Sequence, residues 1–254
     1  MRRLFKLSLF LIWLVSSSVS YATPIKIAAG KSYTLYYSTA ASLCTVLQKE
    51  SKKECEVVIT DNSIENRDLL TSDKVNYALI HKELISKDLI QIKKLYTEHL
   101  YILYKGPKKE SLAEISKYPY LLNKNSNVFH LLKDLFKSLD VSFSPLDSLS
   151  TEDRFNKFCY GDSQVFFYTT GHPSDFIDNA ILECGNINIY SLSPEELSQL
   201  NNFHSTSEIL YQNNKIHTKT TDIYLVAKKD EHNISNILDK YSIFLQKMNK
   251  HIAK

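Results

Sequence analysis

The sequence predicts an α/β protein of two lobes with a ligand cleft between them. β-prone runs alternate with helical stretches along nearly the whole chain, and helices between successive strands are typical of parallel sheets covered on both faces. The 254 residues are enough for two domains with cores of their own. A Gly-Pro turn at residues 106–107 divides the alternation into two blocks.

The N-terminus indicates export. Arg2, Arg3 and Lys6 precede a short apolar run at residues 7–15, and small residues follow up to Ala22. This pattern is typical of a signal peptide cut after Ala22. The apolar run is about half of the ~20 residues that a membrane-spanning helix needs, which makes an uncleaved anchor the weaker alternative. We therefore expect residues 1–22 to be removed and the mature protein to be a periplasmic monomer.

The four cysteines fit an oxidising compartment. Four cysteines allow three pairings, and we favour Cys44 with Cys55 and Cys159 with Cys184. The first bond would tie the end of one helix to the start of the next strand. The second would brace both flanks of the turn "FFYTTGHP" at residues 166–173. C-x-x-C motifs and short-spaced Cys/His clusters are absent from the sequence, so we expect no metal site.

Charge and motifs argue against nucleic-acid binding and catalysis. The net charge is only +3, and basic and acidic residues are interspersed rather than gathered into a basic stripe. G-x-S-x-G, H-E-x-x-H and P-loop motifs do not occur. The "GDS" at residues 161–163 is similar to the motif of GDS-type hydrolases. In those enzymes the motif follows the first strand, whereas here it lies at a helix-to-strand turn. We expect no catalytic residue, no enzyme activity and no cofactor.

The first block alternates three short strands with two helices and ends in a long strand. Asn62 and Ser63 are suited to begin the second helix as capping residues. Apolar residues in the first helix follow a helical period. The expected strands are residues 25–30, 55–61, 75–82 and 95–105, and the expected helices are residues 36–53 and 63–74.

The second block repeats this alternation and ends in a long helix. Its expected strands are residues 118–124, 141–147, 163–171, 186–193 and 220–229, and its expected helices are 126–140, 150–161, 174–184, 194–203 and 234–252. We expect residues 23–104 and 206–254 to form lobe 1 and residues 105–205 to form lobe 2. Two α/β lobes crossed by the chain, each a mainly parallel sheet flanked by helices, are typical of a type II-like periplasmic binding protein, in which the ligand lies between the lobes.

Three segments resemble the TAXI subfamily of TRAP-transporter solute-binding proteins. The first segment, "IKIAAGKSYTLYYSTAASLC", shares Ile27, Gly30, Tyr36, Tyr37 and Cys44 with the family pattern. The second, "CEVVITDNSIENRDLLTSDKVNYALIHKE", shares Cys55, Val57, Thr60, Ser63, Asn66, Leu70, Ala78 and Leu79. The third, "FCYGDSQVFFYTTGHPSDFIDNAILEC", is the most specific and shares Cys159, Gly161, Phe167, Tyr168, Gly171, His172, Pro173, Ile177, Ala180 and Cys184.

The departures from the family pattern lie in the loops that would contact the ligand. The family's first loop is rich in glycine, so that backbone N–H groups approach an anionic ligand, whereas this chain has Gly30 alone among residues with side chains. Asp61 and Asn62 replace the glycines before the second helix, and His81 begins the segment that replaces the family's Gln-Ser-Asp. The resemblance therefore predicts the scaffold better than the ligand chemistry.

The expected ligand-binding residues lie at strand ends and helix starts. Lys124, Asn125 and Ser126, in the loop before a helix, are suited to bind an anion. His172 either donates a hydrogen bond to a ligand carboxylate or holds its own turn, and Thr170 has the same two interpretations. The two arginines beyond the signal peptide, Arg67 and Arg154, fall within expected helices and are interpreted as solvated charges. The further expected contacts are Ser32, Thr34, Tyr36, Asn62, Ser63 and His81.

The resemblance implies an extracytoplasmic protein that captures a small carboxylate-bearing solute by closure of two lobes. The expected ligand classes are dicarboxylates, keto acids and amino acids, and the expected membrane partner is a TRAP-type permease. The alternative is an exported interaction protein that retains the fold but has lost ligand transport. The loss of glycine from the first loop would suit this alternative.

Overall fold

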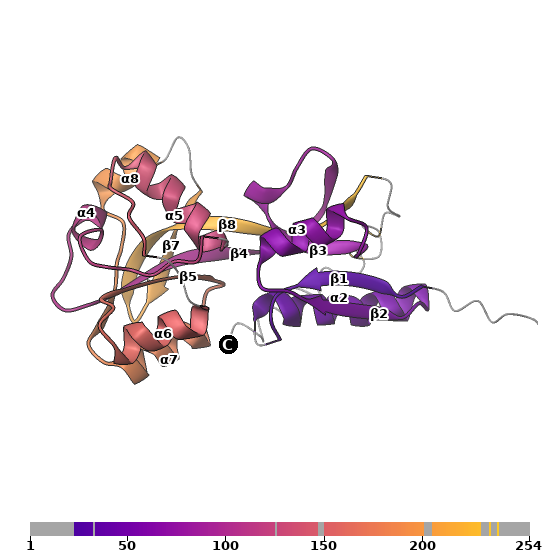
Figure 1. Ribbon diagram of the computed structural model, residues 1–254, viewed down its shortest axis with the longest axis horizontal. Helices are drawn as coiled ribbons and strands as arrows, with labels where there is room; N and C mark the ends of the chain where they lie inside the picture. Colours follow the sequence, from indigo (N-terminus) through magenta and orange to yellow (C-terminus); the bar gives the residue numbers. More distant parts are fainter. Residues whose placement is uncertain are drawn as a thin grey trace, which may run out of the picture.

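Two lobes are joined by the long strands β4 (Leu89–Lys105) and β8 (Asn214–Lys228), as the computed structural model shows (Figure 1). The structure describes residues 23–32, 34–124, 126–146, 150–200 and 205–229, together with 234 and 238. The expected signal peptide and most of the expected C-terminal helix lie outside this described part. No helix within it is both long and apolar enough to cross a membrane.

Lobe 1 contains the N-terminal elements. These are β1 (Ile25–Ala29), α2 (Leu35–Ser51), β2 (Cys55–Ile59), α3 (Ser63–Thr71), β3 (Tyr77–His81) and the 3-10 helix η1 (Lys82–Leu84). Helix α2 begins where the Thr34 side chain accepts a hydrogen bond from the N–H of Tyr37, and it ends at Lys52 in the left-handed region. Strand β3 is buried along its whole length because it lies between β1 and β8.

Lobe 2 contains α4 (Leu112–Ile115), α5 (Asn127–Ser138), α6 (Thr151–Tyr160), β5 (Val165–Thr170), α7 (Asp175–Cys184), β6 (Ile187–Ile189), α8 (Pro194–Leu200) and β7 (Thr206–Tyr211). Helix α5 buries the residues of one face at the spacing that a helix requires, from Val128 to Phe136. In β4, alternate residues face opposite sides of the sheet, with Leu100 and Ile102 on one side and Tyr101 and Leu103 on the other.

The sheet is mixed, which differs from the mainly parallel lobes that the alternation predicts. The described strands form one eight-stranded sheet in the order β2-β1-β3-β8-β4-β5, with β6 beside β4 and β7 beside β8. Only β1 pairs in parallel, with β2 and β3, and the other described pairings are antiparallel. Strands β4 and β8 run directly between the lobes in opposite directions, so the strands that pair with them need no helical crossover.

Two expected strands are absent, and one hairpin is new. Residues 118–124 and 141–146 make only a single bridge, between Leu121 and Leu146, within the part of the chain that the structure describes. Pro119 and Pro145 each remove a backbone donor from these segments. Strands β7 and β8 form a hairpin whose turn residues have left-handed φ angles of 46° and 66°. Such angles are typical of two-residue hairpin turns.

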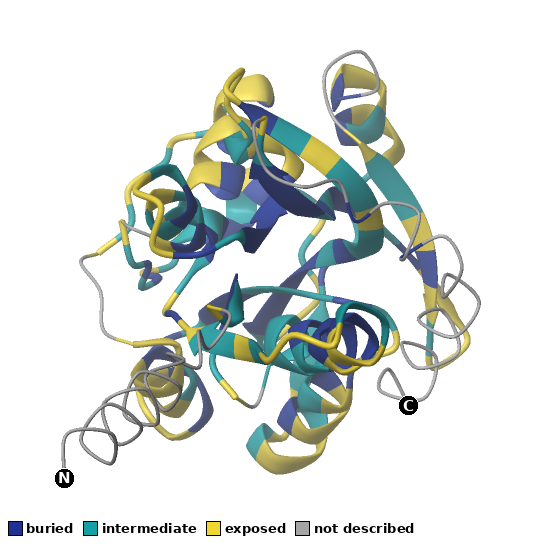
Figure 2. Ribbon diagram, turned by 90° about the vertical axis from the view of Figure 1, so that its right-hand side faces the viewer, coloured by how far each residue is buried: buried dark blue, intermediate teal, exposed yellow. Residues whose placement is uncertain are grey.

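Two hydrophobic clusters fill each lobe, one on either face of the sheet. Helices α2 and α3 cover opposite faces in lobe 1, and α5 and α6 cover opposite faces in lobe 2. Figure 2 shows buried strands beneath helices whose outer faces are exposed. Leu100–Tyr104, Ile209 and Ile216 belong to the clusters of lobe 2, whereas the sequence-based boundaries placed them in lobe 1. The expected boundary at Lys105 marks the end of a strand that is already inside lobe 2.

Each lobe holds one disulfide, and both favoured pairings are confirmed. Cys44 at the end of α2 is bonded to Cys55 at the start of β2, across a separation of 11 residues. Cys159 in α6 is bonded to Cys184 at the end of α7, across 25 residues. Disulfides are typical of proteins in an oxidising, extracytoplasmic compartment.

Candidate functional site

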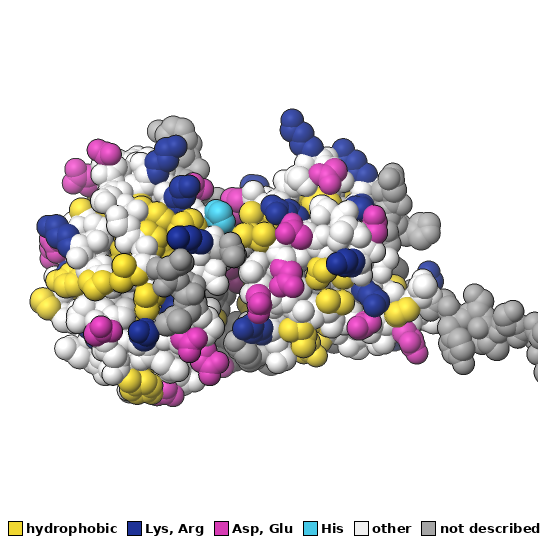
Figure 3. Space-filling view, in the orientation of Figure 1, with side chains coloured by type: hydrophobic (Ala, Val, Ile, Leu, Met, Phe, Trp, Pro, Cys, Tyr) yellow, Lys and Arg dark blue, Asp and Glu magenta, His cyan; other side chains and the backbone are white. Residues whose placement is uncertain are grey.

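The lobes approach each other where β5 ends and α2 begins. A Cβ atom at Gly171, just after β5, would lie only 3.0 Å from Cδ2 of Leu35 in the first turn of α2. A larger residue here would press on the Leu35 side chain, so glycine eases the close approach of the two lobes. The surface narrows between the lobes, and charges of both signs are interspersed over the visible face (Figure 3). We call this region the interlobe site.

A buried polar pair lies on the lobe 1 side of the interlobe site. His81 Nε2 is 3.0 Å from Oε2 of Glu98, and these residues are only 5% and 4% exposed. The N–H of His81 also donates to the hydroxyl of Ser63, at 3.0 Å. His81 ends β3 and Glu98 lies where β4 leaves lobe 1, so the pair joins the end of one strand to the crossing of another.

Three buried polar atoms of the interlobe site, two on its lobe 1 side and one on its lobe 2 side, lack a hydrogen-bond partner among the described residues. They are the hydroxyl oxygens of Tyr36 and Tyr96 and Nδ1 of His99, and we call them the open atoms. The rings of Tyr36 and Tyr96 meet edge-on, with centroids 6.1 Å apart, and Tyr36 is equally close to the ring of His81. Burial raises the pKa of both tyrosines, and the charge of Glu98 raises it further. The Ser63 hydroxyl, which lies beside the Tyr36 hydroxyl without meeting hydrogen-bond geometry, partly offsets this rise for Tyr36.

The lobe 2 side of the interlobe site carries two histidines. The rings of His99 and His172 have centroids 6.0 Å apart, and Nδ1 of His172 is hydrogen-bonded to the Tyr101 hydroxyl at 2.8 Å. Burial, followed by the neighbouring His172, lowers the pKa of His99 to about 4. His99 is therefore neutral near pH 7, with ring nitrogens suited to hydrogen-bond a ligand.

Strand β8 adds a buried lysine and a threonine. The Thr221 hydroxyl donates to Oε2 of Glu83 at 2.6 Å, and Nζ of Lys219 donates to the carbonyl of Leu131 at 3.3 Å. Lys219 is 5% exposed, and burial lowers its pKa. The bond from Lys219 to α5 places a positive charge beside the crossing strands, on the side of lobe 2.

Several expected ligand contacts instead begin helices. Thr34, Asn62 and Ser126 each accept hydrogen bonds from backbone N–H groups of the first helical turn. Capping a helix in this way contributes about 1 kcal/mol, so these residue types have a structural reason to be there. Of the other expected contacts, Ser32 and Lys124 are exposed, and Asn125 lies outside the described residues.

The remaining expected contacts meet at the interlobe site. Tyr36, Ser63 and His81 lie on its lobe 1 side, while Thr170 and His172 lie beside His99 on its lobe 2 side. His172 holds its own turn through Tyr101, which is one of the two interpretations that its sequence allowed. Whether any of these residues contacts a ligand remains a prediction.

Two residues shared with the family pattern, Thr60 and Asn66, hold in place the loops that border the interlobe site on lobe 1. The Thr60 hydroxyl lies within hydrogen-bond distance of the carbonyl of Ala29, at 2.6 Å, and of Oδ1 of Asn66, and its single proton can be donated to either oxygen. Nδ2 of Asn66 donates to the carbonyl of Leu79 at 2.8 Å. These bonds tie α3 to the ends of β1, β2 and β3. Thr60 and Asn66 are buried, so their role is to fix the loops that border the site.

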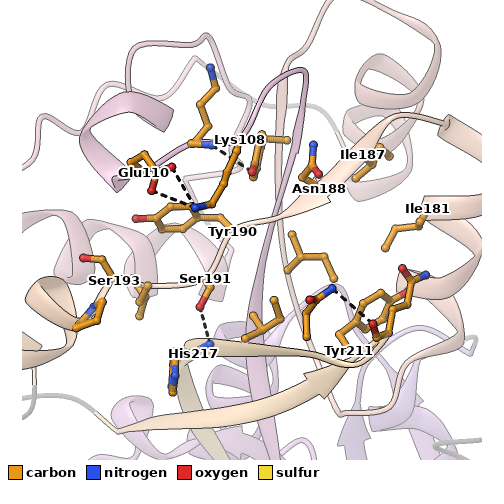
Figure 4. Close-up of a pocket in the computed structure, with 18 residues that line it drawn as sticks. Lys108, Glu110, Ile181, Ile187, Asn188, Tyr190, Ser191, Ser193, Tyr211 and His217 are labelled. Atoms are coloured by element: carbon orange, nitrogen blue, oxygen red, sulfur yellow. Dashed lines mark hydrogen bonds and ion pairs between the residues drawn. The ribbon is translucent and has the colours of Figure 1, made fainter.

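A groove of about 500 Å³ on lobe 2 is a competing site (Figure 4). It lies between β6, the β7–β8 turn and residues 108–110. Polar groups that line it have partners: Lys108 pairs with Glu110 at 3.1 Å, and the Tyr190 hydroxyl donates to Glu196 at 2.6 Å. Because these groups are satisfied, the groove presents less unmet hydrogen-bonding capacity than the interlobe site.

Sequence reasoning missed the most informative residues of the interlobe site. Glu98 and His99 interrupt an otherwise β-rich run, and a charged residue inside a buried strand is a usable signal. Tyr96 carries no such signal, because tyrosine is common in strands. The described residues contain no cluster of three or more His, Cys, Asp or Glu side chains suited to hold a metal ion.

Comparisons with known proteins support the fold. By sequence, the chain matches no protein-family model and no curated protein. By structure, it is similar to the GluR0 ligand-binding core in complex with L-glutamate, with 9% identity, a TM-score of 0.61, and coverage of 92% of this chain and 99% of that one. A double mutant of the VFT2 domain of Bordetella pertussis BvgS has 14% identity and a TM-score of 0.58, covering 96% of this chain and 95% of that one.

A third similar structure is the effector-binding domain of QuiR in complex with shikimate. It has 13% identity and a TM-score of 0.55, and the match covers 90% of this chain and 98% of that domain. At such low identity the likeness concerns the fold alone. The protein therefore has the two-lobed α/β fold of type II periplasmic-binding-protein-like domains, as the alternation of strands and helices predicts. The resemblance to the TAXI subfamily stays a prediction.

Proposed function

We propose that this protein captures a small solute between its lobes outside the cytoplasm and delivers it, unchanged, to a TRAP-type permease. The observation that carries this proposal is the set of open atoms of Tyr36, Tyr96 and His99. Buried polar atoms are nearly always hydrogen-bonded, so three such atoms where two lobes meet indicate a place that a ligand completes.

The disulfides and the sequence resemblance support the location and the partner. Two disulfides suit an exported protein. The permease is inferred from the resemblance to the TAXI subfamily, in which the solute-binding protein serves such a transporter. Release of the solute to a permease requires the lobes to separate, and β4 and β8 are the connections about which they would move.

The charges of the interlobe site constrain how a carboxylate-bearing solute would lie. Glu83 and Glu98 are on the lobe 1 side, and like charges repel. Hydroxyl or amino groups of the solute are therefore expected to face Glu98 and the open atoms. The carboxylate is expected to face lobe 2, where Lys219 lies.

Ligand screening tests the proposal. Mature protein is unfolded, freed of bound molecules, refolded and screened by thermal shift against dicarboxylates, keto acids and amino acids. A ligand that binds the native state raises the melting temperature by mass action. The double variant Tyr36→Phe/Tyr96→Phe should weaken that shift, while its ligand-free melting temperature stays equal or rises because two open atoms are removed.

Tyr190→Phe is the matched control, since the Tyr190 hydroxyl is already bonded to Glu196. This variant should lower the ligand-free melting temperature and leave the affinity unchanged. The proposal fails if no compound of the panel shifts the melting temperature of folded wild-type protein.

The exported interaction protein is the second candidate, and the first loop favours it. The hydroxyl of Thr34 donates to the carbonyl of Lys31 at 2.7 Å, and Nζ of Lys31 is 3.4 Å from Asp61. These contacts close the loop that the family keeps open with glycine. A folded protein that binds nothing in the panel would favour this candidate.

A further inference from the structure

Arg154 is a buried arginine that the sequence had marked as a solvated helix charge. It lies in the first turns of α6 and is only 3% exposed. Its Nη2 donates to the Thr151 hydroxyl at 3.0 Å. Nε and Nη1 are buried and have no hydrogen-bond partner among the described residues.

The guanidinium has no carboxylate partner in the described part of the chain. Arg67, by contrast, lies 2.8 Å from Asp68. In α6 itself, Asp153 is exposed and accepts a hydrogen bond from Ser150 instead. Burial lowers the pKa of Arg154 to about 10, so the group still carries its charge near neutral pH. A buried charge without a counter-charge is strongly unfavourable, which makes an external anion the natural partner.

An aromatic cluster lies beside this guanidinium. Cζ of Arg154 lies 5.7 Å from the ring centroid of Phe166, with Phe155 and Phe176 packed beside that ring. The ring of Tyr168 stacks on Phe166 at 6.0 Å. A flat guanidinium in apolar surroundings is suited to bind a flat carboxylate through charge-assisted hydrogen bonds.

Tyr168 connects Arg154 to the interlobe site. It lies in β5, opposite Tyr101 of β4 and three residues before Gly171, where the lobes approach each other. Tyr168 also lies close enough to Tyr96, which carries one of the open atoms, for the ionised forms of the two residues to influence each other. Arg154 therefore lies in lobe 2, and Tyr168 is the residue that relates its surroundings to the interlobe site.

We propose that Arg154 binds a carboxylate group of the solute, and that this ion pair selects carboxylate-bearing ligands for the interlobe site. The inference rests on the proposed function. It names Arg154 as the residue that makes the site prefer carboxylate-bearing solutes. The carboxylate of the solute supplies the missing counter-charge on lobe 2. Other polar groups of the solute form hydrogen bonds with the open atoms.

The test compares Arg154→Met and Arg154→Lys with wild-type protein by titration calorimetry. The probes are succinate, 2-oxoglutarate and L-glutamate, each beside a neutral amide, namely succinamide for succinate and the amide analogues of the other two. Loss of a charge-assisted contact should weaken carboxylate binding by roughly ten- to a hundredfold in Arg154→Met. Arg154→Lys should recover part of the affinity, because it keeps the charge without the planar fork. Arg67→Met is the matched control and should bind as wild type does.

Ligand-free stability separates binding from a purely structural role. Arg154→Met removes a buried charge that lacks a counter-charge, so its melting temperature without ligand should equal or exceed that of wild type. A lowered melting temperature together with unchanged carboxylate affinity would overturn the inference.

The remaining outcomes distinguish this inference from the proposed function. If the neutral amides bind as tightly as the carboxylates and Arg154→Met binds both normally, the interlobe site takes a solute but Arg154 does not select it. If inorganic phosphate or sulfate binds in an Arg154-dependent way and no carboxylate does, the carboxylate class is wrong. If no probe binds to folded wild-type protein, the proposed function fails as well.

Discussion

The buried charged groups of the two lobes differ in their hydrogen-bond partners. In lobe 1, Glu98 is hydrogen-bonded to His81 at 3.0 Å, and both side chains are almost fully buried. In lobe 2, Arg154 is equally buried, but its only described hydrogen bond is to Thr151. The buried charged pair of lobe 1 is therefore satisfied without a ligand, whereas lobe 2 holds a buried charge with no counter-charge among the described residues.

This difference indicates that the buried pair of lobe 1 mainly stabilises the fold, whereas the buried arginine of lobe 2 is available to bind a ligand. A satisfied buried pair fixes the ends of β3 and β4 and thereby shapes the lobe 1 side of the interlobe site. A buried guanidinium without a counter-charge lowers the free energy of unfolding of the ligand-free protein, and this loss is recovered when an anion binds. We expect loss of the buried pair in lobe 1 to lower stability, and loss of the buried arginine in lobe 2 to weaken ligand binding.

The largest expected effect is the loss of the buried pair. Glu98→Ala leaves His81 without its partner and should lower the free energy of unfolding by about 3–5 kcal/mol in urea titrations. Glu56→Ala removes an exposed partner of Lys26 in the same lobe and should cost less than about 1 kcal/mol. Equal effects of the two variants would show that the buried pair does not hold lobe 1.

Each disulfide should affect its own lobe. Replacing Cys44 and Cys55 by alanine opens a short loop and should cost about 3 kcal/mol, and replacing Cys159 and Cys184 should cost slightly more because the loop is longer. The second replacement also releases α6, which carries Arg154. It should therefore weaken carboxylate binding, measured at a temperature where both variants remain folded, while the first should not.

A smaller effect concerns the pH dependence of His99. Its pKa is about 4 in the folded protein, because burial disfavours the charged ring, and about 6.5 when unfolded. The unfolded state therefore binds more protons between these values, so stability falls as pH decreases from about 6.5 to 4. His99→Gln should reduce this slope by roughly 1–2 kcal/mol over the window, as measured by urea unfolding at several pH values. An unchanged slope would contradict the burial of His99.

The smallest effect is expected at the surface of the first loop. Lys31 and Asp61 form an exposed pair at 3.4 Å, so Lys31→Ala should change the free energy of unfolding by less than about 1 kcal/mol. Because the pair closes the loop beside α2, the variant tests whether loop closure limits ligand entry. An increased rate of ligand association in stopped-flow measurements would support that role, and an unchanged rate would exclude it.

Local patterns predicted much of the scaffold. Helix α5 begins at its capping Ser126 and buries the face that its apolar spacing marks, and the strands of lobe 1 follow short β-prone runs. Both cysteine pairings are as favoured. These features depend on residues close together in the sequence, where spacing and propensity act directly.

Strand direction and lobe boundaries could not be predicted in the same way. Strands β4 and β8 are far apart in the sequence and pair antiparallel across both lobes. The Gly-Pro turn after Lys105 marks the end of β4 but not the end of a lobe. Pairing partners are chosen by the packing of the whole sheet, which no local pattern contains.

The sequence by itself determined the α/β class, the helix starts and the disulfide pairs. Only the tertiary structure decided which polar side chains meet at the interlobe site and whether they are satisfied there. Thr34, Asn62 and Ser126 have the composition of binding residues but cap helices, while Arg154 has the pattern of a surface charge but is buried. The physical reason is that burial and hydrogen-bond satisfaction depend on contacts between distant segments, and these form only when the lobes pack.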